Sequence, residues 1–178
     1  MFSGFTFNSK HSSNFDLYVK TINRPLLPEL RKREVLVPSK NGVYDFMGNT
    51  YENKLIELSC TVIKPKMPDL RQQARLISGW LKDKGILRFD DEPDKYYIGR
   101  VYSSAPLKNV VGTGFFTLIF DVEPFAYSDT NTLEVTRTDD SPFFIFNNGN
   151  VEAPNEITIT NLGVNTINGF RIKLIKTQ

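Results

Sequence analysis

Residues 67–85 read MPDLRQQARLISGWLKDKG, and their apolar side chains recur at the spacing of an α-helix, whereas the segments on both sides alternate like strands. The apolar stripe consists of Leu70, Ala74, Leu76, Ile77, Trp80 and Leu81. We predict an amphipathic helix with Asp69 as its N-cap and Gly85 as the left-handed residue beyond its end. Because a stripe of this kind is usually buried, we expect it to pack against the chain's own sheet rather than to bind a partner.

Alternating segments on both sides of the helix predict an antiparallel sheet. In residues 54–63 one face carries Ile56, Leu58, Cys60 and Val62, and in residues 110–127 one face carries Phe116, Leu118, Phe120 and Val122. Shorter runs of this kind are at residues 1–7, 14–22, 35–37 and 44–46. Because Cys60 lies on an apolar face, we interpret it as a small buried hydrophobe rather than a reactive thiol.

An acidic turn, DDEPD at residues 90–94, connects two further predicted strands at residues 85–89 and 95–102. The turn lacks the spaced oxygen ligands and the glycine of a calcium-binding loop, so we interpret it as a hairpin turn and not as a cation site. Strands, helix and hairpin together predict a mainly β fold of the α+β class.

Residues 25–46 form a less regular region that we expect to be extended, because Pro25 and Pro28 remove backbone donors. The dipeptide Asn41-Gly42 favours a turn with positive φ. The region carries more apolar surface than a free loop usually displays. Its candidate subunit-interface residues are Pro25, Leu26, Leu27, Leu30, Val35, Val37, Tyr44 and Phe46. The alternative is an arm that folds back on its own domain.

The composition changes at residue 128, where SDTNTLEVTRTDDSP is polar and rich in Thr and Asp. Such a segment marks a boundary, so we predict an N-terminal domain at residues 1–130 and a short C-terminal β module at residues 131–178. Short strands are expected at residues 143–146, 156–160 and 169–175. About forty residues bury too little surface for a self-sufficient sandwich, so this module is either trimmed or completed by something else.

The composition also excludes several classes of function. The 178 residues carry a formal net charge of +2 that is spread along the chain, which does not favour nucleic-acid binding. One Cys and one His, His11 in a polar turn, cannot build the usual zinc site, and the sequence has no G-x-S-x-G elbow, phosphate loop or facing acid/base pair. We therefore expect neither enzyme activity nor a cofactor or metal.

The N-terminus lacks a basic start followed by an apolar run, and no segment approaches the roughly 18 apolar residues of a membrane span. These features predict a protein without a signal peptide or membrane insertion, made in the cytosol.

Four pieces of the sequence, taken in order, resemble the distal tail proteins of long-tailed phages with Gram-positive hosts. They are FSGFTFNSKHSSNFDLYV, INRPLLPELRKREVLVPSKNG, DDEPDKYYIGRV and FFTLIFDVEPFAYSD, and they cover most of residues 1–130. The resemblance implies an antiparallel β-sandwich with one helix and a protruding hairpin, six copies of which form a ring between the tail tube and the tail tip or baseplate. The implied partners are the chain itself, the tail tube protein, and the hub, tail-associated lysin or receptor-binding protein of the tip. The implied location is the tail tip of a phage or prophage particle.

The stretch IFNNGNVEAPNEITI also resembles the start of the family's second domain, a galectin-like sandwich. The chain departs from the family pattern in two places. It ends at Gln178, where that domain would continue, and it has Ser39-Lys40-Asn41-Gly42 where many members have a Gly-Arg-Asp-Gly-like turn. We therefore expect an incomplete C-terminal sandwich.

A second hypothesis is a carbohydrate-binding module that attaches the particle to host cell-wall glycans. Such a module needs an aromatic platform on its C-terminal sandwich. The aromatic residues after Tyr127 are only Phe143, Phe144, Phe146 and Phe170. A third hypothesis, a wall-degrading enzyme, is opposed by the lack of an acid/base or zinc set.

Overall fold

The computed structural model describes residues 4–46, 50–64, 66–104, 106–110, 113–129, 132–137, 141–152, 154, 156–166, 169 and 171–173. The chain divides into two compact units, Met1–Glu134 and Val135–Gln178. The elements of the first unit are β1 (Phe5–Phe7), β2 (Lys10–His11), the 3-10 helix η1 (Ser12–Phe15), β3 (Leu17–Asn23), β4 (Glu34–Val35), β5 (Tyr44–Asp45), β6 (Lys54–Ile63), α1 (Met67–Leu81), β7 (Gly85–Phe89), β8 (Lys95–Ser104), β9 (Lys108–Val110), β10 (Thr113–Val122) and β11 (Tyr127–Ser128).

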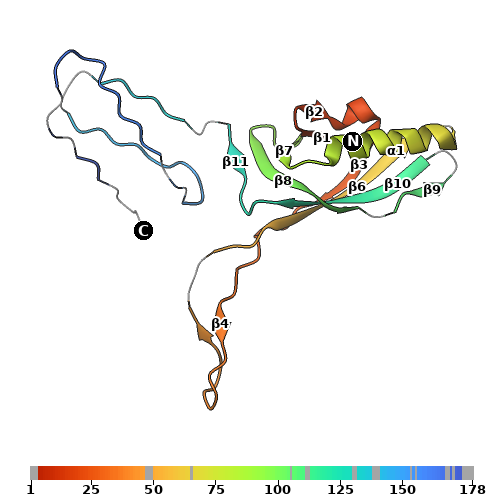
Figure 1. Ribbon diagram of the computed structural model, residues 1–178, viewed down its shortest axis with the longest axis horizontal. Helices are drawn as coiled ribbons and strands as arrows, with labels where there is room; N and C mark the ends of the chain where they lie inside the picture. The colour runs from red at the N-terminus through yellow and green to blue at the C-terminus, as the bar shows by residue number, and fades with distance from the viewer. Residues whose placement is uncertain are drawn as a thin grey trace. The chain divides into compact units, whose positions relative to one another are not determined.

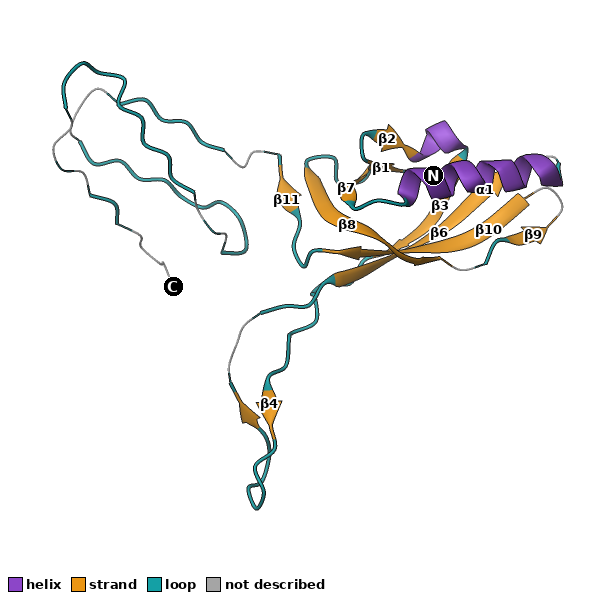
Figure 2. Cartoon of the chain, in the orientation of Figure 1, coloured by secondary structure: helices purple, strands orange, loops and turns teal. Residues whose placement is uncertain are grey.

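Nine of the described strands form one antiparallel sheet in the order β2-β1-β7-β8-β10-β6-β3, with β11 beside β8 and β9 beside β10. Strands β6 and β10 pair along ten residues each, and helix α1 lies along one face of the sheet (Figure 1). The described part of this unit consists mostly of strands and contains α1 and η1 as its helices (Figure 2). The mainly β fold of the α+β class predicted from the sequence is therefore confirmed.

The sheet curls, so that strands distant in its order face one another across the core. Strands β7 and β8 separate β1 from β10, which in a flat sheet would place these two strands about 14 Å apart. The ring of Phe120 nevertheless lies 5.7 Å from the ring of Phe5 and 5.6 Å from the ring of Phe7. One continuous curled sheet thus supplies both layers that the sequence analysis expected from a sandwich.

Two β-bulges add twist to this sheet. The pairing of β3 with β6 shifts between Val19 and Thr21, which leaves Lys20 without an opposite residue. The pairing of β8 with β10 shifts in the same way, and Tyr102 is the extra residue. Bulges of this type bend the strand that carries them and increase its right-handed twist, which favours curling over a flat sheet.

The predicted inward faces of the long strands are confirmed. Ile56, Leu58, Cys60 and Val62 of β6 are buried, as are Leu118, Phe120 and Val122 of β10. Phe116 is only partly buried and packs against this core from its margin.

Helix α1 covers the core with the face that the sequence predicted, since Leu70, Ile77, Trp80 and Leu81 are buried. The ring of Trp80 stacks on Phe15 at 4.3 Å and on Phe5 at 5.4 Å, and its indole N–H donates to the carbonyl oxygen of Phe7 at 2.9 Å. One side chain therefore joins α1 to both β1 and η1. Leu76, which the sequence placed in the apolar stripe, is 53% exposed.

Both predicted helix ends are wrong. The helix begins at Met67, so Asp69 lies within its first turn and does not cap it. Pro68 fits this turn because the first amides of a helix have no intrahelical acceptor. Gly85 begins β7, where a β-carbon would lie 1.9 Å from Oδ1 of Asn8, so a larger residue would displace the Asn8 side chain.

The C-terminal unit contains no strand among its described residues, so the strands expected at residues 143–146 and 156–160 are wrong. The third, at residues 169–175, falls largely outside the described residues. Phe144 and Phe146 are 72% and 78% exposed. Alternating apolar residues form a strand only where other strands pair with the backbone and another layer covers the side chains.

Replacing Trp80 with Ala should lower the free energy of unfolding by about 3–5 kcal/mol, because it removes the ring contacts and takes the donor from the buried carbonyl of Phe7. Replacing Leu76 with Ala, on the exposed side of the same helix, should change it by less than about 1 kcal/mol. Urea denaturation followed by circular dichroism measures both variants. Equal losses would contradict the central position of Trp80.

Replacing Gly85 with Ala should lower the free energy of unfolding by about 1–3 kcal/mol, because the added methyl group displaces the side chain of Asn8. Gly79 is the matched control, since a β-carbon there has no neighbour within 4 Å. Its replacement with Ala in the middle of α1 should raise the free energy by about 0.5–1 kcal/mol. Thermal unfolding of both variants measures the difference, and a stabilised Gly85→Ala variant would contradict the close approach.

Candidate subunit interface

The chain leaves the sheet after β3 and returns to it at β6 as a narrow two-stranded projection (Figure 1). We call its described residues, 25–46 and 50–52, the arm. In the outer part of the arm, β4 pairs with β5, and the amide of Phe46 donates to the carbonyl oxygen of Arg33 at 3.1 Å. At its tip Ser39 and Gly42 have φ values of 66° and 81°. Positive φ is therefore confirmed for Gly42, while Ser39 adopts it in place of Asn41.

The root of the arm has a ladder of its own. Leu30 and Tyr51 form an antiparallel bridge between the two sides of the arm. The amide of Arg31 donates to the carbonyl oxygen of Thr50 at 2.8 Å, and the amide of Glu52 donates to that of Glu29 at 2.7 Å. The guanidinium of Arg31 also binds the carboxylate of Glu52 at 2.7 Å, and this hydrogen bond lowers the pKa of Glu52. The ring of Tyr51 contacts the ring of Phe125 edge to face at 5.3 Å, which attaches the root to the segment after β10.

All eight candidate interface residues named from the sequence lie on the arm and are exposed: Pro25, Leu26, Leu27, Leu30, Val35, Val37, Tyr44 and Phe46. Exposure reaches 94% at Leu26 and 70% at Leu27. The alternative of an arm folded back on its own domain does not agree with these values. The sequence analysis missed Leu36 and Val43, which are 78% and 45% exposed.

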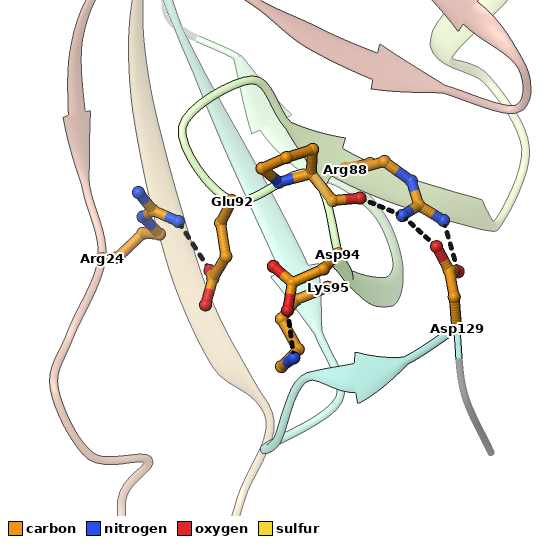
Figure 3. Close-up of polar contacts among 7 residues, drawn as sticks. Arg24, Arg88, Glu92, Asp94, Lys95 and Asp129 are labelled. Atoms are coloured by element: carbon orange, nitrogen blue, oxygen red, sulfur yellow. Dashed lines mark hydrogen bonds and ion pairs between the residues drawn. The ribbon is translucent and has the colours of Figure 1, made fainter.

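A second set of contacts holds the last strand of the first unit. Arg88 on β7 binds Asp129 through two hydrogen bonds of 2.7 Å and also donates to the carbonyl oxygen of Pro93 (Figure 3). The bond from Arg88 lowers the pKa of the Asp129 carboxyl. The ring of Tyr127 stacks on Tyr96 at 5.5 Å.

Ion pairs also occupy the acidic turn at residues 90–94. Arg24 donates to Asp91 and to Glu92, the latter at 3.2 Å, and Lys95 binds Asp94. In the part of the chain that the structure describes, no group of three or more His, Cys, Asp and Glu side chains is arranged to hold a metal. The turn is a hairpin turn between β7 and β8, as predicted.

His11 and Cys60, the only His and the only Cys of the sequence, both contact neighbouring groups within the fold. His11 lies on the short strand β2, where Nε2 is 3.1 Å from Asp90 and Nδ1 is 2.6 Å from the hydroxyl of Ser13. Cys60 is buried, and burial raises the pKa of its thiol to about 12. Among the described residues, the helices are too short or too polar to cross a membrane.

Two open hollows lie on the described surface of the first unit. One of about 330 Å³ is lined by Thr6, Asn8, Ser9, Ile86 and Arg88. Another of about 260 Å³ is lined by Asn53, Lys84, Ile98, Gly99, Arg100, Asp121 and Glu123. Neither lining includes an aromatic ring on which a sugar stacks, so these hollows do not favour the carbohydrate-binding hypothesis.

The curled sheet and the projecting arm define a β-rich domain with an extended hairpin. The family model described as the phage tail protein RIFT-related domain matches residues 15–122, which is more than half of the chain. The chain therefore belongs to this family of phage tail proteins.

The Dit protein (gp 19.1) of SPP1 has the same fold. It is described as a paradigm of the hub adsorption apparatus in phages that infect Gram-positive hosts. The two structures agree with a TM-score of 0.61 at 16% sequence identity, over 71% of this chain and 52% of the Dit chain. The chain thus spans about half the length of that protein. A search of the curated proteins finds no match.

These comparisons confirm the resemblance to siphophage distal tail proteins that was stated from the sequence. The chain is a structural phage tail protein, and its place is the tail of the virion.

Cys60 should be unreactive in the folded chain. At about pH 8, a thiol with a pKa of about 12 carries roughly a thousandfold less thiolate than an ordinary one, and burial adds a steric barrier. We expect an aromatic disulfide reagent, which releases a coloured thiolate when it reacts, to label Cys60 at least about a hundredfold more slowly in the native protein than in denaturant. Equal labelling rates would contradict the burial of β6, and Cys60→Ser provides the background.

Proposed function

We propose that this chain is a distal tail protein whose N-terminal domain, residues 1–130, assembles as a cyclic homohexamer between the tail tube and the tail tip or baseplate of a long-tailed phage. Membership of the phage tail family and the fold of SPP1 Dit support this role. The number of copies rests on the sequence resemblance. The role is one of assembly and attachment, without enzyme activity.

The observation that carries the proposal is the exposed apolar arm. Side chains such as Leu26, Leu27 and Leu36 are each at least 70% exposed, although a soluble protein usually covers a contiguous group of this kind. A ring needs a heterologous interface, in which one patch of a subunit binds a different patch of the next. The projecting arm is suited to the first of these two patches.

The internal ladder of the arm supports the same role. Pairing of β4 with β5 and the bridge between Leu30 and Tyr51 hold the arm extended before any partner binds. A pre-formed element loses little conformational entropy on docking, so more of the free energy from apolar burial goes into binding.

We further propose that the two ends of the ring contact the tail tube protein and a tip component, either the hub, a tail-associated lysin or a receptor-binding protein. Residues 131–178 form the start of a galectin-like module in this proposal. Their exposed side chains, including Phe144 and Phe146, become buried when another part of the assembly covers them. The chain is made in the bacterial cytoplasm and reaches the tail tip by assembly.

The wild-type chain should form hexamers at high concentration or within assembled tail tips, as measured by native mass spectrometry and electron microscopy. The double variant Leu26→Asp/Leu27→Asp should shift this equilibrium towards monomer, because it places two charges in the proposed contact. Leu76→Asp is the matched control, since Leu76 is an exposed leucine on α1. It should leave assembly unchanged.

Five-fold, two-fold or strictly monomeric behaviour in both settings would overturn the ring. A ring that survives deletion of residues 25–46 would overturn the arm as its contact while leaving the ring intact.

A further inference from the structure

Strands β10 and β11 behave as one strand with an interruption. Both pair with the same strand, β8: Val122 lies opposite Gly99, and Tyr127 lies opposite Tyr96. The amide of Glu123 still donates to the carbonyl oxygen of Ile98 at 2.9 Å. Residues 124–126 then leave the regular pairing, as expected where Pro124 has no backbone donor.

This interruption is where the root of the arm contacts the body of the domain. Phe125 lies within it, and its ring meets the ring of Tyr51 edge to face at 5.3 Å. Tyr51 in turn forms a β-bridge with Leu30 on the opposite side of the arm. A displacement of the arm root therefore acts directly on the segment that connects β10 to β11.

Strand β11 is short and lies at the surface of the sheet. It has two residues and is stabilised by the stack of Tyr127 on Tyr96 and by the hydroxyl of Tyr127, which donates to Glu123 at 2.6 Å. Beyond it, Asp129 binds Arg88 with 55% and 29% of the two side chains exposed. A short strand with exposed contacts opens at low cost compared with the core, so release of β11 from β8 needs little free energy.

We propose that the arm and β11 are energetically coupled through Tyr51 and Phe125. In this mechanism a fixed arm root holds residues 124–126 in place and keeps β11 paired with β8. Loss of that support releases β11 more often. Because residues 127–129 end the sheet of the first unit, the state of β11 sets where the rest of the chain departs from it.

The coupling deepens the proposed function, since it rests on the arm as the contact between subunits. A neighbour that binds the arm would then steady the departure point of the C-terminal residues without touching them. Coupling free energies are reciprocal, so release of β11 should also loosen the arm root.

Hydrogen exchange measured by NMR on the monomeric full chain tests the coupling. In Tyr51→Ala, exchange of the backbone amides in residues 127–129 should rise about two- to tenfold, the factor that corresponds to loss of one edge-to-face ring contact. Tyr51→Phe retains the ring and should exchange like the wild type. Tyr44→Ala is the matched control, because the ring of Tyr44 packs against Phe46 within the arm itself.

The reverse experiment uses Asp129→Asn, which should increase exchange of the amides of Arg31 and Glu52 at the arm root. Amides of β6 serve as the internal reference and should not change in any variant. Unchanged exchange at residues 127–129 in Tyr51→Ala, or an equal rise in Tyr44→Ala, would overturn the coupling. Because this measurement needs only the monomer, its failure is distinct from a failure to form the ring.

Discussion

The hydrogen bond from the indole of Trp80 to the carbonyl oxygen of Phe7 is the constraint on which the first unit depends. A buried N–H must find an acceptor, and this acceptor lies on β1, near one end of the sheet. The bond fixes the position of α1 relative to β1. In the same core, Phe5 and Phe7 of β1 meet Phe120 of β10. The helix position, the curl of the sheet and the aromatic core are therefore one arrangement.

The sequence predicted the features of this arrangement that depend on burial. Periodicity reports which face of an element is apolar, so the inward faces of α1, β6 and β10 followed from spacing alone. The ends of α1 did not, because Asp69 is a good cap in isolation while Pro68 is equally suited to a first turn. Gly85 fits a local rule for helix ends, but its actual constraint comes from Asn8, which is distant in the sequence. The C-terminal strands failed because alternation describes a side-chain pattern and supplies no pairing partner.

In the arm too, the sequence predicted features that depend on neighbouring residues but not contacts between residues far apart in the chain. Its excess of apolar residues was visible in the sequence, whereas Leu36 and Val43 were not among the named candidates. An arm that projects from its sheet exposes both faces (Figure 1). The contact between Tyr51 and Phe125 and the ion pair of Arg88 with Asp129 join residues far apart in the chain. No spacing rule brings such pairs together before the fold is known.

The bulge at Lys20 hinders β-pairing between neighbouring molecules. Strand β3 forms one end of the sheet, and a regular edge strand offers a template on which strands from other molecules add without limit. The extra residue breaks the repeat of donors and acceptors there, and an exposed lysine adds charge. At the opposite end, β2 offers only two residues. Copies of the chain packed closely together are thereby discouraged from polymerising through the edges of their sheets.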